Sequence, residues 1–389
     1  MDKKEYSNLV NGITYTNQIQ LSSQFKFCGN CFRADTYRGC DHGCKYCFAN
    51  NRMACNFGGE NNMQIGDHDK VANMFSKAFD FGGTTKSADL AIELMRRRVT
   101  MHLGGMSDPF QQRELRRELT LKFLGLASFY KYPLVISTKG VILMTMHLEQ
   151  QERYLKCLNP RLHTFQISLI GKDEDWVRKF ETGSPTPDER IKFIKWLKER
   201  GFWVSVRIQP LLNLRQAELV LDELYGIINY CTIEHLKLPK FNDKIWSSVL
   251  EHLPLEYKAL LRSSEHKPEF ELNARVKLDN IQYLKQKFPK LKFGCGDNDL
   301  HEYSDSLNCC GIDTMPMTEF SNWLKYNSMY IKMTGDRTQW VPESRINGLF
   351  LDDREKNKKG FKYRDFVEDY YRTIYEDDRQ LSLFNTENK

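Results

Sequence analysis

Three cysteines within one short loop constrain this chain more than any other feature of its sequence. Cys40, Cys44 and Cys47 follow a C-x3-C-x2-C spacing, and Gly39 and Gly43 let the backbone wrap closely around whatever the thiols bind. Three thiolates on one loop can hold three irons of a cubane cluster and leave the fourth iron open, which suits a catalytic site. Structural zinc normally takes four closed ligands. The spacing therefore favours an iron–sulfur cluster, with zinc as the alternative.

The remaining composition predicts a cytoplasmic protein with reduced cysteines and no membrane partner. Residues 1–6 lack the apolar core of a signal peptide, and no uncharged apolar run approaches the roughly 18 residues that a membrane helix needs. In a reducing compartment, clustered cysteines more often serve metal or redox chemistry than disulfides, and the total of 11 is odd. The net charge of +6 is compatible with a nucleic-acid partner without requiring one.

Strand-like and helix-like segments alternate beyond the cysteine loop. The apolar pattern predicts strands at 99–103, 134–138, 164–170, 202–211 and 233–238. Helical patterns separate these strands at 111–129, 144–157, 187–199 and 214–229. With a further strand leading into the cysteine loop, this order predicts βα units and an α/β fold around a parallel sheet.

The residues around the three cysteines resemble a known family signature. Thr36–Ala49 reads TYRGCDHGCKYCFA, which is similar to the signature of radical S-adenosylmethionine (radical SAM) enzymes and, more narrowly, of their spore photoproduct lyase-like branch. The resemblance implies a partial (β/α)6 TIM-like barrel with a smaller C-terminal α+β extension. It also implies that Cys40, Cys44 and Cys47 bind a [4Fe–4S] cluster whose open iron chelates S-adenosylmethionine. An electron from a donor such as flavodoxin or ferredoxin would then cleave this cofactor to methionine and a 5′-deoxyadenosyl radical.

The resemblance also implies a set of cofactor-positioning residues at the strand ends, where functional groups of such barrels gather. This set is Gly104, Gly105, Ser107, Lys139, Ser168 and Arg207. Without the resemblance, Gly104 and Gly105 would form a plain turn, and Lys139 would be a solvated loop residue. Arg207 lies in an apolar strand, where burial requires an anionic partner. That partner is either the cofactor carboxylate or an internal acidic side chain.

One departure from the family concerns the reaction itself. Spore photoproduct lyase carries a cysteine two residues before the matching serine, and this cysteine returns a hydrogen atom to the product radical. Here that position is Gly105. We therefore expect a radical outcome other than repair of the thymine spore lesion. Further along, Lys179–Arg190 resembles the E-P-x-A-P-S-P-x-x-R segment of the family.

A second group of cysteines suggests an auxiliary metal site. Cys28 and Cys31 form a C-x2-C knuckle, which needs two more ligands. Cys295 and Cys309, near the other end of the chain, would supply them and complete a second [4Fe–4S] cluster or a structural zinc site. The alternative is that these residues are reduced, buried thiols.

The C-terminal tail carries a compact apolar motif within a polar, charged stretch. Its residues are Gln380, Leu381, Ser382, Leu383 and Phe384. Short apolar anchors in such tails commonly dock into grooves of a partner. The pentapeptide resembles the bacterial sliding-clamp binding motif, which would place the protein at replicating or repaired DNA. Basic clusters at 96–98 and at Arg113, Arg116 and Arg117 could meet phosphates, although such helix surfaces are more often simply solvated.

Together these features predict four parts and one principal function. The parts are an N-terminal segment 1–34, a radical SAM partial barrel 35–245, a C-terminal domain 246–350, and a charged helix and tail 351–389. The predicted function is a radical SAM enzyme that repairs or modifies DNA and is recruited through the sliding clamp. One alternative directs the same chemistry to a peptide, RNA or small molecule. Another is a non-catalytic, zinc-stapled DNA-binding adaptor of the clamp.

Overall fold

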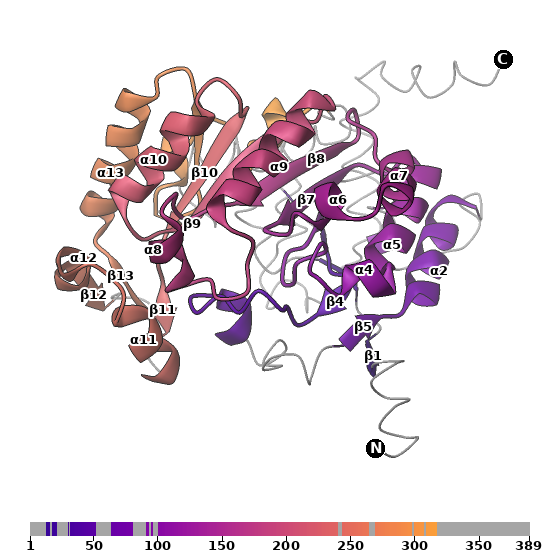
Figure 1. The fold of residues 1–389 in the computed structure, drawn as a ribbon, viewed down its shortest axis with the longest axis horizontal. Helices are drawn as coiled ribbons and strands as arrows, with labels where there is room; N and C mark the ends of the chain where they lie inside the picture. The colour runs from indigo at the N-terminus through magenta and orange to yellow at the C-terminus, as the bar shows by residue number, and fades with distance from the viewer. Residues whose placement is uncertain are drawn as a thin grey trace, which may run out of the picture.

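A mostly parallel sheet forms the centre of the molecule (Figure 1). The computed structural model describes residues 13–15, 18–21, 30, 32–51, 64–80, 91, 92, 95, 100–239, 243–263, 269–297, 299–306 and 309–316. The eight strands lie in the order β2 (Ile19–Leu21), β3 (Phe32–Ala34), β6 (Met101–Leu103), β7 (Leu134–Thr138), β8 (His163–Ser168), β9 (Val204–Leu211), β10 (Tyr230–His235) and β14 (Lys292–Cys295). Every pairing from β3 to β14 is parallel, whereas β2 is antiparallel to β3. The predicted α/β class is confirmed.

Helices connect the parallel strands and cover one side of the sheet (Figure 1). They are α2 (His68–Phe79), α4 (Glu114–Arg117), α5 (Leu119–Phe129), α6 (Ile142–Thr145), α7 (Leu148–Cys157), α8 (Glu174–Arg178), α9 (Pro187–Glu199), α10 (Leu214–Leu224) and α13 (Ala274–Lys287). Among the described residues, no helix is both long and apolar enough to cross a membrane.

Smaller elements flank the central sheet. One three-stranded sheet joins β1 (Ile13–Tyr15), β5 (Gln64–Gly66) and β4 (Tyr37–Arg38), and another joins β11 (Leu238–Pro239), β13 (Glu269–Leu272) and β12 (Leu261–Ser263). Two short helices, α11 (Asp243–Leu250) and α12 (Leu255–Leu260), precede β12. Single 3-10 turns occur at η1 (Phe48–Asn51), η3 (His301–Tyr303) and η4 (Ile312–Thr314).

Local capping explains why some predicted boundaries agree with the structure and others do not. Helix α9 has the predicted bounds, because Thr186 and Glu189 form a capping box and Pro187 occupies the first turn. The single helix predicted at 111–129 is wrong. Glu118 adopts a left-handed backbone conformation with φ 51° and separates α4 from α5. The helix predicted at 214–229 stops at Leu224, because the following residue is extended.

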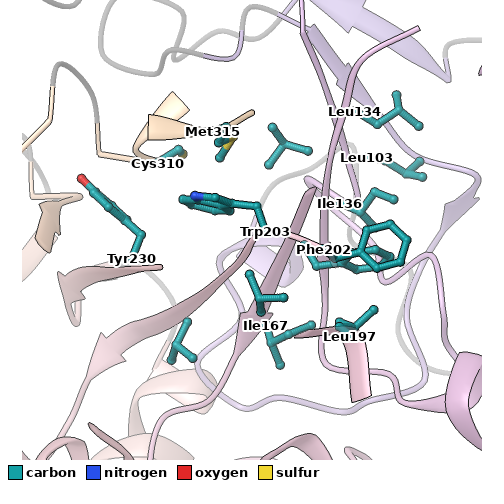
Figure 2. Close-up of a cluster of buried hydrophobic side chains, with 14 of the residues drawn as sticks. Leu103, Leu134, Ile136, Ile167, Leu197, Phe202, Trp203, Tyr230, Cys310 and Met315 are labelled. Atoms are coloured by element: carbon teal, nitrogen blue, oxygen red, sulfur yellow. The ribbon is translucent and has the colours of Figure 1, made fainter. Parts of the chain in front are cut away.

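Alternation along the strands gives the sheet two different faces. The helix-covered face is apolar, and Figure 2 shows Leu103, Ile136 and Ile167 gathered there with residues of the hydrophobic core. The opposite face, called the polar face below, carries His102, Ser137, Gln166, Ser168, Arg207, Gln209, Thr232 and Glu234. A parallel sheet covered on both sides would bury apolar residues on both faces. The polar face therefore provides chemistry rather than packing.

Residues 309–316 pack against one end of the polar face. Gly294 permits this approach, because a Cβ there would lie 2.0 Å from the Cys309 carbonyl oxygen. The Thr232 hydroxyl donates a hydrogen bond to that oxygen at 2.9 Å. Figure 2 shows Cys310 beside the rings of Trp203 and Tyr230. Both β14 and this segment come from the stretch 246–350, so the C-terminal stretch contributes directly to the central sheet; the four-part division itself stays a prediction.

Candidate active site

The cysteine loop lies between β4 and η1, at the carboxyl-terminal edge of the parallel strands. Cys44 is buried, Cys40 and Cys47 are half-buried, and all three thiols are reduced. Gly43 has φ +60°, and a Cβ there would lie 2.6 Å from the Thr182 hydroxyl, so the loop requires glycine at this position. This confirms the close backbone wrapping expected from the sequence.

The thiols lie in surroundings that favour their binding to a positively charged group. Burial raises the pKa of Cys40 well above its ordinary value, and the charges of Asp108 and Cys44 add to this effect. Burial also raises the pKa of Cys44 to about 11, although the Lys139 ammonium opposes the shift. Buried thiolates therefore need a cation to compensate them, and metal binding supplies one.

His42, between the first two cysteines, joins the loop to the rest of the site. Its Nε2 lies 3.0 Å from Oδ2 of Asp108, and both side chains are buried. Asp108 also accepts hydrogen bonds from the Thr138 hydroxyl and from the backbone N–H of Lys139, each at 2.6 Å. Burial opposes ionisation of Asp108, but His42 and these bonds lower its pKa to about 2. Through Asp108, His42 therefore connects the loop to the end of β7.

A fully buried ion pair fixes the other side of the loop. The backbone of Glu181 forms an isolated antiparallel β-bridge with that of Cys44. The Glu181 carboxylate lies 2.6 Å from the Arg190 guanidinium. Arg190 also donates to the Ser168 carbonyl at 2.9 Å, and the Tyr46 hydroxyl donates to Glu181. Burial opposes ionisation of Glu181, yet Arg190 and Lys139 keep its pKa below the ordinary value. The Lys179–Arg190 segment thus ties the cysteine loop to the end of β8.

Lys139 follows β7 and lies beside the cysteine loop. Its ammonium is 5.7 Å from the centre of the Tyr46 ring. Burial alone would lower the pKa of Lys139, but the charges of Cys44 and Glu181 outweigh it and raise the pKa. Lys139 is therefore a cation at the edge of the loop, where it can meet an anionic group bound by the cysteines.

The two glycines after β6, Gly104 and Gly105, allow neighbouring parts of the chain to pack directly against the backbone. Gly104 has φ +88°, and a Cβ there would lie 2.4 Å from the Ser137 carbonyl oxygen. A Cβ on Gly105 would lie 2.4 Å from Cγ of Arg33. The side chain of Arg33 therefore occupies the space that a side chain at position 105 would need.

Ser107 and Asp35 shape the turn that follows these glycines. The Ser107 hydroxyl donates to the Tyr37 carbonyl at 2.6 Å. The Asp35 carboxylate accepts from the backbone N–H groups of Met106 and Ser107, at 2.7 and 3.0 Å. Asp35 was not identified from the sequence, because a single acidic residue before the signature carries no distinguishing pattern.

Arg207 and Ser168 are register partners on the polar face. Arg207 donates to Oγ of Ser137 at 2.9 Å and to Oε1 of Gln209 at 2.6 Å. Oγ of Ser137 also lies 2.6 Å from Nε2 of His102, which the sequence reasoning missed. Within the described ranges, Arg207 has no acidic side chain within 4.0 Å, so the predicted internal salt bridge is not formed there.

Residues 35–218 match the family model of the radical SAM superfamily. This part of the chain is similar to a radical SAM domain. The match begins immediately before the cysteine loop and ends within α10, so it contains the carboxyl ends of β6, β7, β8 and β9.

Curated relatives of the chain are found in mycobacteria. The chain is 30% identical over 207 residues to uncharacterised proteins of Mycobacterium tuberculosis and Mycobacterium bovis. These matches cover 51% of this chain and 54% of each relative. The chain thus spans about half the length of the curated relatives it matches.

Several solved structures match the chain at TM-scores below 0.5. A spore photoproduct lyase variant is 14% identical with a TM-score of 0.48, and the match covers 74% of this chain and 82% of that protein. Methylornithine synthase is 15% identical with a TM-score of 0.41, over 91% and 84% of the two chains. Streptococcus suis SuiB bound to S-adenosylmethionine is 14% identical with a TM-score of 0.40, over 67% and 49%.

The donor set of the cysteine loop fits a [4Fe–4S] cluster. Three soft sulfur donors are held on one loop, with Lys139 as a nearby cation for an anionic cofactor group. Among the described residues, one group gathers three ligand atoms within single-ion distance, namely Cys40, Asp41 and His42 within 4.8 Å. A cubane instead places each thiolate on a different iron, so it does not require such close gathering.

The predicted auxiliary metal site is only partly visible. Cys28 and Cys31 lie outside the described residues, as do Gln380–Phe384 and 96–98. Cys295 is fully buried, and alternation places it on the helix-covered face beside Cys231. Cys309 approaches β14 from the opposite face, at Gly294. A shared site therefore stays a prediction, in which Cys295 is buried and Cys309 is half-buried.

Proposed function

We propose that this protein is a radical SAM enzyme that acts on DNA, as a repair or base-modifying enzyme. The observation that carries the catalytic part is the cysteine loop, held between Asp108 and Glu181 at the ends of parallel strands. When bound, a [4Fe–4S] cluster and S-adenosylmethionine supply one-electron cleavage of the cofactor. The residues of the chain bind and orient these groups and the substrate.

The cofactor-positioning roles follow from where the side chains lie. Lys139 is beside Cys44 and Glu181, so its ammonium would bind the carboxylate of S-adenosylmethionine as a point charge. Ser168 ends β8 next to Arg207, where its half-buried side chain would face the ribose. Gly104 and Gly105 let the backbone approach the methionine end. The Ser107 hydroxyl is already used by the Tyr37 carbonyl, so Ser107 acts by shaping the turn.

The DNA assignment is supported by charge and by two sequence resemblances. Helix α4 carries Arg116 and Arg117 in its last turn. This helix begins close to the cysteine loop, because the side chain of Gln111 accepts a hydrogen bond from the Asp41 N–H at 3.2 Å. Cationic side chains at the rim of a site can hold the phosphates of a nucleic acid. The signature around the cysteines and the pentapeptide 380–384 support the same substrate class.

Two protein partners belong to this proposal. The pentapeptide Gln380–Phe384 would bind the bacterial sliding clamp, and flavodoxin or ferredoxin would donate the electron. Deletion of 380–384 should abolish clamp binding in a pull-down with purified clamp. Unchanged binding after this deletion would contradict the assignment of the motif.

Anaerobic reconstitution tests the catalytic proposal. We expect about four irons per chain from one cluster, or about eight if an auxiliary cluster is present. Addition of dithionite and S-adenosylmethionine should release 5′-deoxyadenosine, and single-stranded DNA should increase the rate. Cys44→Ala should remove the catalytic cluster, whereas Cys157→Ala, a half-buried cysteine on α7, should retain it.

The same experiment separates the alternatives. Zinc instead of iron, with no cofactor cleavage, would favour the clamp adaptor and overturn the enzyme proposal. Cofactor cleavage without any effect of DNA would favour a peptide, RNA or small molecule as substrate.

A further inference from the structure

Among the described residues, no acidic side chain balances the charge of Arg207 on the polar face. Arg207 is half-buried in the sheet, and its two hydrogen bonds go to the neutral groups Gln209 and Ser137. By comparison, the fully buried Arg190 has the Glu181 carboxylate at 2.6 Å. Removing a guanidinium from water without an anion is costly. This position is therefore suited to an anion that comes from outside the chain.

The neighbours of Arg207 hold its guanidinium in a defined orientation. The Ser137 hydroxyl donates to Oε1 of Gln166 at 3.1 Å, so its oxygen is left to accept from Arg207 and from His102. Burial and the Arg207 charge lower the pKa of His102 to about 4, so the imidazole is neutral at pH 7 and donates through Nε2. A guanidinium has five N–H donors, and only two of them serve these bonds. The remaining fork is available for a planar pair of anionic oxygens.

Arg207 and Lys139 serve different parts of the site. Lys139 is influenced by Cys44, Cys47 and Glu181, which places it at the cluster loop. The charge of Arg207 instead lowers the pKa of His102, and the charge of Arg33 on β3 lowers it further. The cofactor carboxylate, which binds at the cluster, is therefore matched by Lys139. Arg207 lies apart from the cluster loop, beside His102 on the polar face. Arg33, the register partner of His102, already has the Asp35 carboxylate 3.2 Å from its Nε.

We propose that Arg207, oriented by Ser137 and Gln209, binds a phosphodiester group of a single DNA strand on the polar face. The inference rests on the proposed function and identifies which group of the substrate is held. An arginine fork matches two phosphate oxygens, and phosphate contacts position a strand without reading its sequence. Ser168 is the register neighbour of Arg207, so the bound phosphate lies next to the cofactor end of the site.

Binding measurements on the reconstituted full-length protein test this assignment. The ligands are a short single-stranded oligothymidylate, the same strand with neutral methylphosphonate links, and S-adenosylmethionine. The variants are Arg207→Gln, Arg207→Lys and the matched control Arg200→Gln, which removes an exposed arginine that stacks on Trp196 of α9. Iron content and circular dichroism verify that each variant is folded and loaded.

We expect Arg207→Gln to weaken binding of the charged strand by roughly 10- to 100-fold, the range for loss of a charge-assisted contact. Arg207→Lys should recover only part of this, because lysine lacks the planar fork. The methylphosphonate strand should bind the wild-type protein at least as weakly as the charged strand binds Arg207→Gln, because it also loses its contacts with other cationic side chains. Arg200→Gln should change neither affinity, and S-adenosylmethionine should bind all variants within about twofold.

Three results would overturn the proposal. If Arg207→Gln weakened S-adenosylmethionine binding and left the oligonucleotide unaffected, Arg207 would hold the cofactor carboxylate instead. If the wild-type protein bound the charged and neutral strands equally, no phosphate would be recognised. If it bound neither strand, the DNA assignment would fail as well. A ribonucleotide strand that bound more tightly than the DNA strand would move the substrate to RNA. Cofactor cleavage, measured separately, shows whether the catalytic proposal survives each of these results.

Discussion

The carboxylate of Glu181 lies 2.6 Å from the guanidinium of Arg190, and both side chains are completely buried. The pair lies directly behind the cysteine loop, because Glu181 also bridges to Cys44. A buried ion pair is weak evidence for stability by itself, since desolvation offsets the attraction. Arg190 also donates a hydrogen bond to the carbonyl of Ser168, the last residue of β8. The ion pair therefore fixes the cysteine loop relative to β8.

Glu181→Gln should therefore be strongly destabilising. The substitution leaves the Arg190 charge buried without its partner, which typically costs about 3–5 kcal/mol. Glu174→Gln is the matched control, because Glu174 forms an exposed pair with Arg178 at 3.5 Å and should cost less than about 0.5 kcal/mol. Urea unfolding of the apo-protein measures both. Equal costs for the two variants would show that the buried pair does not support the loop.

The two glycines at positions 104 and 125 should respond in opposite directions to alanine. Gly104→Ala forces a Cβ into a left-handed backbone position 2.4 Å from the Ser137 carbonyl, which should cost about 2–5 kcal/mol. Gly125 lies within α5, and nothing lies within 4 Å of a Cβ added there. Gly125→Ala should therefore stabilise the protein by about 0.5–1 kcal/mol. Thermal unfolding of both variants tests the prediction, and a stable Gly104→Ala would contradict the tight crossing.

Much of the sheet could be predicted because local pattern and tertiary packing agree there. The strand predicted at 134–138 and the helix predicted at 187–199 have the observed bounds, since β7 is continuously buried and Thr186 caps α9. The cysteine spacing likewise lies within the stretch that matches the radical SAM family model. In these segments the side chains that determine the element are neighbours in sequence.

The remaining features depend on contacts between residues far apart in sequence. The pairing of β14 with β10 joins positions about sixty residues apart, and the approach of Cys309 to Gly294 depends on the absence of a side chain. His102 and Asp35 were missed for the same reason. Neither belongs to a local motif, and each acquires a role only when the ends of neighbouring strands come together.

Cys295 offers a test of the auxiliary metal site. It is fully buried in the core, and burial raises the pKa of its thiol to about 12. We expect Cys295→Ser to destabilise the protein by about 1–3 kcal/mol, because a hydroxyl is then buried in apolar surroundings. The metal content of the reconstituted protein should stay unchanged. Loss of iron or zinc from this variant, with the catalytic cluster retained, would instead establish Cys295 as a ligand.

His163 should make stability depend on pH. It is fully buried, and burial lowers its pKa from 6.5 to about 4. Its Nδ1 accepts the Asn159 N–H at 3.1 Å, so the proton of the neutral ring lies on Nε2, near the Tyr132 carbonyl. Between pH 4 and 6.5 the folded state binds fewer protons than the unfolded state. The contribution to stability is therefore complete above pH 6.5 and is lost as the pH falls toward 4.

The expected loss is about 3 kcal/mol between pH 7 and pH 4, from a shift of roughly 2.5 pKa units. His163→Gln should remove this part of the pH dependence and leave the contributions of other groups, such as His102, unchanged. Urea unfolding of both proteins across this pH range gives the contribution of His163 as the difference between their free energies of unfolding. If the free energy of unfolding depended on pH in the same way for both proteins, His163 would be protonated in the folded state at no cost in stability. That result requires the Asn159 contact to open before the protein unfolds.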